Sequence, residues 1–135
     1  MVRHKHFPVV SWNRYHAEHE HIIYCGNGSR PGKYAHWFGP KQETTVWDIP
    51  LDAHAQRMHP TQKPVALYER AITNSSAPGD TIIDCFSGSG TCIVAAEKHR
   101  RRAFLMELNP AYCDVTISRW MNLTGHKAEI IALKN

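Results

Sequence analysis

The sequence predicts an α/β domain in which helices flank a parallel sheet. Two observations predict it over residues 59–135. Short apolar runs alternate with segments of helical periodicity, and a glycine-rich loop joins one such run to the next helix. Strands that alternate with helices form parallel sheets with right-handed crossovers. The predicted sheet is narrow, about half of a full doubly wound domain, and we expect it to leave an open edge.

The elements of this region follow from local signals. Pro64 suits the first position of a helix, because an N–H group there has no helical partner, and the 74–80 turn ends that helix. Thr81–Cys85 is suited to a buried parallel strand. The remaining predicted elements are a helix at about 91–99, a strand at 103–106, a helix between the caps Asn109 and Gly125, and a last strand at 129–133.

Residues 1–58 differ in composition. They carry seven of the ten histidines and three of the four tryptophans, with strand signals only at 21–25 and 44–47. His19 and His21 would share one face of a strand, but H-E-x-x-H is absent because residue 23 is Ile. We therefore favour a polar strand edge over a metal site.

Bulk properties restrict the function classes. Hydrophobic residues make up 42 % and charged residues 21 % of the 135 residues, which favours a globular domain over disorder. The net charge of +4 fits a polyanionic partner without requiring one. The four cysteines have no C-x-x-C spacing, and no signal peptide or membrane-length apolar run occurs. We expect a reduced, cytoplasmic protein.

The central motif is the loop D-C-F-S-G-S-G-T, from Asp84 to Thr91. Gly88 and Gly90 permit a sharp turn and the close approach of a ligand to the backbone. The helix that follows offers free N–H groups to an anionic group. Glu107 ends the next strand, where an acid can accept hydrogen bonds from both ribose hydroxyls of a nucleoside.

The loop favours one class of nucleoside. A dinucleotide motif needs Gly or Ala where Ile93 stands, and no G-K-[ST] of a P-loop occurs. A nucleoside without a pyrophosphate fits better, and S-adenosyl-L-methionine is the candidate. The alternative is a tight strand-to-helix turn with a core phenylalanine.

Several motifs together resemble a known family. H-P-T-Q-K-P (59–64), Gly79-Asp80, the glycine loop, and E-L-N (107–109) with Tyr112 and Arg119 occur in the order seen in the C-terminal part of N6-adenine and N4-cytosine DNA methyltransferases of the permuted, or beta, class. The match is close over 59–123 and looser upstream, where His19-Glu20 precedes Ile22-Ile23-Tyr24.

The resemblance implies a partial Rossmann-like S-adenosylmethionine-dependent methyltransferase fold. Residues 1–58 would hold the end of the catalytic-side strands and a target-recognition-like loop region, and residues 59–135 the cofactor-binding half domain. Thr61 and Lys63 would lie near the methionine end, with Lys63 able to face its carboxylate, and Glu107 would hold the ribose. The other implied cofactor residues surround the methionine part: Asp84, Phe86, Ser87, Gly88, Ser89, Gly90 and Thr91. For 61–64 the alternative is a helix N-terminus with a solvated lysine.

Double-stranded DNA is the implied macromolecular partner. Basic and aromatic residues mix where the family reads DNA, and such side chains contact phosphates and stack on bases. The candidates are Arg30, Lys33, Trp37 and Lys41. The alternative is an ordinary exposed loop, and the basic run 98–102 is interpreted as a solvated helix end.

The family's catalytic D-P-P-Y-like motif does not occur in these 135 residues. Asn109-Pro110-Ala111-Tyr112 is the nearest string, and we interpret it as a helix cap with a core tyrosine. We therefore assign no catalytic residue, and we expect a truncated, split or degenerate chain whose motif lies upstream or on a second chain. Two functions remain open: part of a site-specific DNA methyltransferase acting on the amino group of adenine (N6) or cytosine (N4), or an inactive cofactor- and DNA-binding remnant. The permuted order argues against an RNA or protein methyltransferase.

Overall fold

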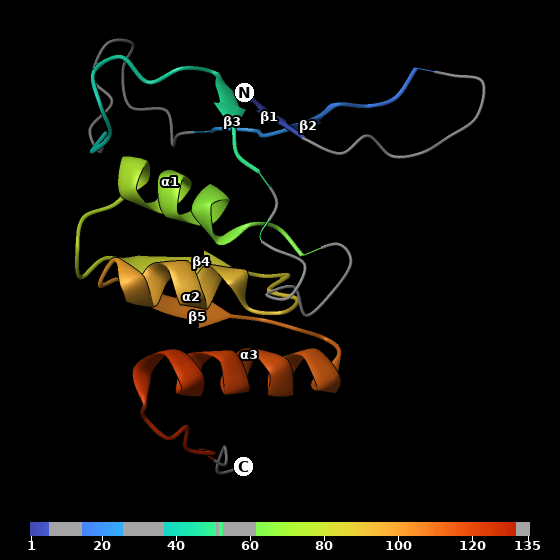
Figure 1. The fold of residues 1–135 in the computed structure, drawn as a ribbon. Coiled ribbons are helices and arrows are strands. Elements are labelled where there is room, and N and C mark those ends of the chain that lie inside the picture. The colour runs from blue at the N-terminus through green and yellow to red at the C-terminus, as the bar shows by residue number, and fades with distance from the viewer. Residues whose placement is uncertain (6–14, 26–36, 51, 53–61, 132–135) are drawn as a thin grey trace.

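The computed structural model describes residues 1–5, 15–25, 37–50, 52 and 62–131. In this part of the chain a small N-terminal sheet lies beside α1, and a layered α/β unit follows (Figure 1). The N-terminal sheet has the order β2-β1-β3, with β1 antiparallel to β2 and parallel to β3. Its strands are β1 (Val2–His4), β2 (His19–His21) and β3 (Val46–Asp48).

Three helices and two parallel strands build the second part. In chain order they are α1 (Val65–Ser75), β4 (Thr81–Asp84), α2 (Thr91–Lys98), β5 (Arg102–Leu105) and α3 (Pro110–Thr124). β4 and β5 pair in parallel, with Ile82 opposite Ala103 and Ile83 opposite Phe104. α2 lies at the centre, in contact with α1, β5 and α3 (Figure 1). The predicted α/β class and parallel pairing are confirmed.

The core lies on one side of the β4–β5 sheet. Ile72 of α1 packs against Ala95 and Ala96 of α2, and the half-buried Ile82 and Ala103 complete the cluster. Small alanines let the helices approach the sheet closely. On the other face, Ile83 and Phe104 are 70 % and 62 % exposed, so one face of this sheet is apolar and uncovered in the described structure.

The helix caps agree with the sequence. Asn109 accepts a hydrogen bond from the Ala111 N–H at 3.0 Å, with Pro110 as the next residue, and Gly125 ends α3 in the left-handed conformation at φ 73°. Pro64 differs slightly, since it is the extended cap residue before α1. Asp52 supplies the missing side-chain acceptor there, at 3.2 Å from the Val65 nitrogen.

Some strand predictions were wrong. Glu129–Ile131 forms no strand, and Ile130 and Ile131 are 99 % and 84 % exposed; the rest of the predicted strand lies outside the described residues. A strand needs a neighbour for its backbone groups, and none lies beside this segment in the described structure. Among residues 62–131, which the structure describes, there are therefore two strands rather than the three predicted for this half of the chain. Strand β1 was not predicted, because V-R-H lacks apolar alternation.

The other N-terminal strands are shifted from the predicted bounds. β2 begins at His19 rather than residue 21, although the Ile22 N–H still donates to the Met1 carbonyl at 2.8 Å. The strand predicted at 44–47 is found at Val46–Asp48.

Among the described residues, no helix has the length and apolar composition that a bilayer crossing needs.

Candidate nucleoside-binding site

The glycine loop connects β4 to α2 and turns twice through left-handed conformations. Gly88 has φ 53° and Gly90 has φ 76°, which side chains other than glycine rarely adopt. The Phe86 N–H donates to the Asp84 carboxylate at 3.0 Å, and the Gly90 N–H donates to the Ser87 carbonyl at 2.9 Å. The loop is thus a turn stabilised by hydrogen bonds between its own residues, and it lies directly before the N-terminus of α2.

Glu107, which lies two residues after β5, is hydrogen-bonded to the glycine loop. Its carboxylate accepts the Gly88 N–H at 2.8 Å and the Asn109 N–H at 2.9 Å. These backbone hydrogen bonds hold the pKa of Glu107 below its usual value. The bond from Asn109 has the largest effect, and that from Gly88 the next largest. The group is therefore ionised near neutral pH. A carboxylate has about four acceptor sites, so Glu107 keeps acceptor capacity for further donors.

Two side chains of α3 donate hydrogen bonds to the backbone of the glycine loop. Arg119 donates to the Ser89 carbonyl at 2.6 Å, and the Thr116 hydroxyl donates to the Gly88 carbonyl at 3.1 Å. A Cβ atom on Gly90 would lie 2.6 Å from the Thr116 methyl carbon. Glycine at 90 is therefore needed for both its conformation and the close approach of α3.

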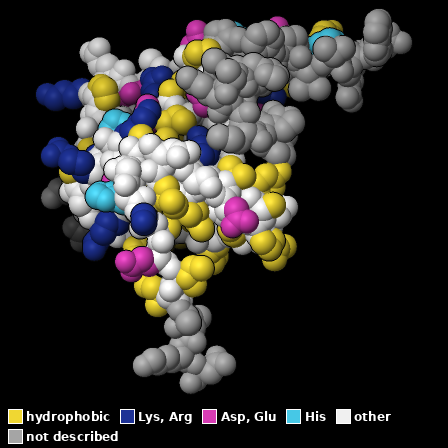
Figure 2. All heavy atoms as spheres, turned by 60° about the horizontal axis from the view of Figure 1, so that its bottom comes forward, with side chains coloured by type: hydrophobic (Ala, Val, Ile, Leu, Met, Phe, Trp, Pro, Cys, Tyr) yellow, Lys and Arg dark blue, Asp and Glu magenta, His cyan; other side chains and the backbone are white. Residues whose placement is uncertain are grey.

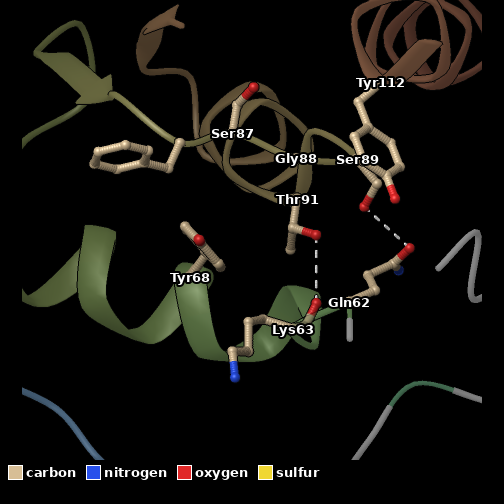
Figure 3. A pocket seen from close by; sticks show the side chains of 9 residues that line it. Gln62, Lys63, Tyr68, Ser87, Gly88, Ser89, Thr91 and Tyr112 are labelled. Atoms are coloured by element: carbon tan, nitrogen blue, oxygen red, sulfur yellow. Dashed lines mark hydrogen bonds between the residues drawn. The ribbon is translucent and has the colours of Figure 1, made fainter. Parts of the chain in front are cut away.

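The segment before α1 forms the opposite wall. The Ser89 hydroxyl donates to the Gln62 side-chain oxygen at 3.2 Å, and the Thr91 hydroxyl donates to the Lys63 carbonyl at 3.3 Å (Figure 3). Gln62, Ser89 and Thr91 are all buried. Two segments 28 residues apart are thus joined by side-chain hydrogen bonds.

A pocket of about 280 Å³ lies between these walls. Its volume is close to the lower limit of roughly 300 Å³ for ordinary ligand pockets. Figure 3 shows its residues converging from the glycine loop, the 62–63 segment, α1 and α3. The lining residues are Gln62, Lys63, Tyr68, Phe86, Ser87, Gly88, Ser89, Thr91 and Tyr112.

The structure gathers six of the predicted cofactor residues around this pocket: Lys63, Phe86, Ser87, Gly88, Ser89 and Thr91. Gly90 lies against Thr116 of α3, and Glu107 accepts a hydrogen bond from the lining residue Gly88. Asp84 instead lines a separate groove beside β4, and one of its carboxylate oxygens accepts the Phe86 N–H. Thr61 lies outside the described residues.

Sequence reasoning assigned no ligand role to three lining residues, Gln62, Tyr68 and Tyr112. Tyr112 was interpreted as a core tyrosine, and Tyr68 shares a helical face with Val65 and Ile72, a spacing that is typical of core residues. Burial, followed by the charges of Asp84 and Cys92, raises the pKa of Tyr68 to about 12, so its hydroxyl stays protonated. Gln62 could have been found from its place in H-P-T-Q-K-P, because it lies between Thr61 and Lys63, which were both predicted to lie near the cofactor.

Two of the four predicted DNA-contacting residues are described. Trp37 and Lys41 are exposed, and neither lines the pocket. Trp37 meets Tyr24 edge to face at 6.4 Å, which places two aromatic rings together on the surface. Arg30 and Lys33 lie outside the described residues.

The basic run 98–102 has a partly structural use. Arg101 donates to the Ser76 hydroxyl at 3.1 Å and to the His99 carbonyl at 2.6 Å, and Lys98 pairs with Glu69 at 3.1 Å. Figure 2 shows Lys and Arg side chains gathered along one side of the molecule, beside exposed hydrophobic side chains. Only part of the run is therefore the solvated helix end that the sequence suggested.

Comparison with known proteins places these features in a family. The model of the N6/N4 methyltransferase family, described as DNA methylase, matches residues 2–118. The chain is 29 % identical over 138 residues to the type II methyltransferase M.HinfI of Haemophilus influenzae, covering 91 % of this chain and 38 % of the relative. It is 36 % identical over 107 residues to the DNA adenine methyltransferase YhdJ of Escherichia coli, covering 76 % and 35 %.

Solved structures agree. The chain is similar to a putative DNA modification methylase from Thermus thermophilus complexed with S-adenosyl-L-methionine, with TM-score 0.59, 26 % identity, and coverage of 93 % of this chain and 54 % of that one. It is also similar to the M1.HpyAVI–SAM complex, with TM-score 0.55 and 28 % identity, and the match covers 63 % of this chain and 43 % of that one. The chain spans little more than a third of the curated relatives above. With the family model matched over most of its length, this chain belongs to the N6/N4 DNA methylase family.

Proposed function

We propose that this chain binds S-adenosyl-L-methionine and forms the cofactor-binding part of a methyltransferase that acts on the exocyclic amino group of adenine (N6) or cytosine (N4) in DNA. One observation carries the proposal. The Glu107 carboxylate is bonded to the Gly88 N–H of the glycine loop, at the edge of the pocket. An acid so placed suits ribose hydroxyls, and the loop suits the close approach of the rest of a nucleoside.

The residues present fit this cofactor. Glu107 keeps acceptor sites beyond its two backbone hydrogen bonds, and Tyr68, Phe86 and Tyr112 supply aromatic surface in the pocket. Lys63 also lines the pocket, and it is the lysine that would face the methionine carboxylate. Two of the similar solved structures are complexes with this cofactor.

The cofactor would supply the methyl group, and this chain's residues would bind and orient it. Positioning is a large part of catalysis for a displacement between two bound reactants. A target base must leave the DNA stack to reach such a site. We propose that residues 1–58 contribute to the target-recognition side, with Trp37 and Lys41 as DNA contacts, and that residues 59–135 form the cofactor half.

The D-P-P-Y-like motif would come from a further segment, in the same polypeptide or on a second chain. A groove of about 600 Å³ beside β4 supports this proposal, since it is lined by Ile72, Ile82, Ile83 and Cys92 together with the half-buried Asp84. In the described structure β4 has only β5 as a strand neighbour. An added strand would satisfy the open edge of β4.

A thermal-shift measurement tests cofactor binding. S-adenosyl-L-methionine should raise the melting temperature of the purified chain in a concentration-dependent way, because a ligand that binds only the folded state stabilises it. NAD is the matched control, since Ile93 replaces the small residue that a dinucleotide loop needs. An equal shift with NAD, or none with S-adenosyl-L-methionine, would contradict the proposal.

Methyl transfer separates the two functions that remain open. We expect the chain alone to transfer no labelled methyl group to DNA and a mixture with a D-P-P-Y-bearing family segment to do so. Cofactor binding without transfer in any such mixture would favour an inactive binding remnant, which the absence of the motif from these 135 residues also supports.

A further inference from the structure

Glu20 of β2 lies at the centre of a cluster of cations. Its carboxylate is 3.2 Å from Arg3 Nη1, 3.5 Å from Lys5 Nζ and 2.7 Å from Lys63 Nζ. Burial alone would raise the pKa of Glu20, but the hydrogen bond and charge of Lys63, with the charges of Lys5 and Arg3, outweigh it and lower the pKa. Glu20 is therefore an anion at neutral pH.

The position of Glu20 does not depend on Lys63. Arg3 lies directly opposite Glu20 in the β1–β2 ladder, and its side chain is almost fully buried. The Arg3 Nε–H also donates to the Ile49 carbonyl at 3.1 Å. The carboxylate is thus held by a fixed buried partner, while Lys63 is the more exposed member of the cluster, at 44 %.

Lys63 belongs to both the cluster and the pocket. Its carbonyl accepts the Thr91 hydroxyl, which places its backbone against the glycine loop. Its side chain extends away from that loop (Figure 3), and its ammonium meets Glu20 instead. The lysine that would face a ligand carboxylate is therefore already bonded to a carboxylate of the protein.

We propose that Glu20 competes with the carboxylate of the bound ligand for Lys63, and so lowers the affinity of the pocket for ligands that carry this group. The inference rests on the proposed function, because it takes an amino-acid carboxylate as the group that Lys63 would face. Two carboxylates that share one ammonium repel each other. Glu20 is then a specificity-determining residue, outside the pocket lining.

Paired ligands and variants test this. The wild type, Glu20→Gln, Lys63→Met and the double variant are titrated with S-adenosyl-L-methionine and with its decarboxylated form, which lacks only the carboxylate. Glutamine keeps an oxygen acceptor for the buried Arg3. Glu69→Gln is the matched control, since Glu69 pairs with Lys98 at 3.1 Å and does not line the pocket.

Glu20→Gln should tighten binding of S-adenosyl-L-methionine by roughly 1.5- to 5-fold, the range expected when one partly exposed ion pair is released. It should leave the decarboxylated ligand unchanged, and its effect should vanish in the Lys63→Met background. Unchanged or weaker binding of the full ligand, or an equal gain for both ligands, would overturn the proposal. Absence of binding to the folded wild type would instead overturn the proposed function, and with it this role for Glu20.

Discussion

Arg119 of α3 donates a hydrogen bond to the carbonyl oxygen of Ser89 at 2.6 Å, across 30 residues of the chain. The same nitrogen lies 3.3 Å from the Ser89 hydroxyl oxygen, which in turn donates to Gln62. Burial lowers the pKa of Arg119, opposed by the charge of Asp52, but an arginine stays protonated at neutral pH. This side chain connects α3, the glycine loop and the segment before α1.

We therefore predict that Arg119→Met destabilises the protein by about 1–3 kcal/mol, because the buried Ser89 groups lose a charged donor. Urea unfolding followed by circular dichroism measures this change. Arg102→Met, on the exposed outer side of β5, is the control and should change stability by about 0.5 kcal/mol or less. Equal effects of the two substitutions would show that Arg119 does not support the loop.

Gly90→Ala and Gly88→Ala should differ although both glycines have positive φ. At Gly88 nothing lies within 4 Å of an added Cβ, so only backbone strain of about 1–2 kcal/mol is expected. At Gly90 the Cβ would also lie within 3.0 Å of three Thr116 atoms, at 2.6, 2.7 and 2.9 Å. Thermal melting should show the larger loss for Gly90→Ala, and a loss no larger than that of Gly88→Ala would refute the close packing of α3.

The cysteines should differ in reactivity. Cys92 is buried, and burial, with the charge of Asp84, raises the pKa of its thiol to about 12. Cys25 and Cys85 are exposed. Since the thiolate is the reacting form, iodoacetamide at pH 8 should label Cys25 and Cys85 first and Cys92 only after unfolding. Peptide mass spectrometry measures the rates, and early labelling of Cys92 would contradict its place in the core.

Stability should fall in acid partly through Glu20. Its pKa in the folded protein lies below the ordinary value of 4.5, so its contribution is fully present above about pH 4.5 and is lost as the pH falls through the lower folded value. Glu20→Gln should therefore show a weaker decline of the unfolding free energy below pH 4.5. Parallel pH profiles for the variant and the wild type would show that the ion pairs of Glu20 contribute nothing to stability.

Local signals in the sequence predicted much of the cofactor-side fold. Proline and glycine punctuation located α1, α2 and α3, and the Asn109 and Gly125 caps are formed by neighbouring residues. The last strand was predicted wrongly, because an apolar run forms a strand only beside a partner. Strand β1 was missed because its centre, the buried Arg3, is stabilised by distant groups on β2 and after β3.

The site was predictable where one continuous segment forms it. The glycine loop is such a segment, and most of its residues line the pocket. The placement of Asp84 in the groove and the pairing of Lys63 with Glu20, 43 residues earlier, depend on packing between separate elements. Periodicity shows that Tyr68 and Tyr112 are partly buried, but it does not show what they are buried against.

The most direct test of the account is calorimetric titration of the purified chain with S-adenosyl-L-methionine, beside Glu107→Gln and Glu97→Gln. Glu97 is the control, because its carboxylate accepts a hydrogen bond from Trp120 at 2.9 Å and does not line the pocket. We predict saturable one-site binding by the wild type and by Glu97→Gln. Glu107→Gln should bind at least about tenfold more weakly, since it loses charged acceptors for the ribose. A folded wild type that does not bind, or a Glu107→Gln variant with the wild-type Kd, would contradict the assignment of this pocket.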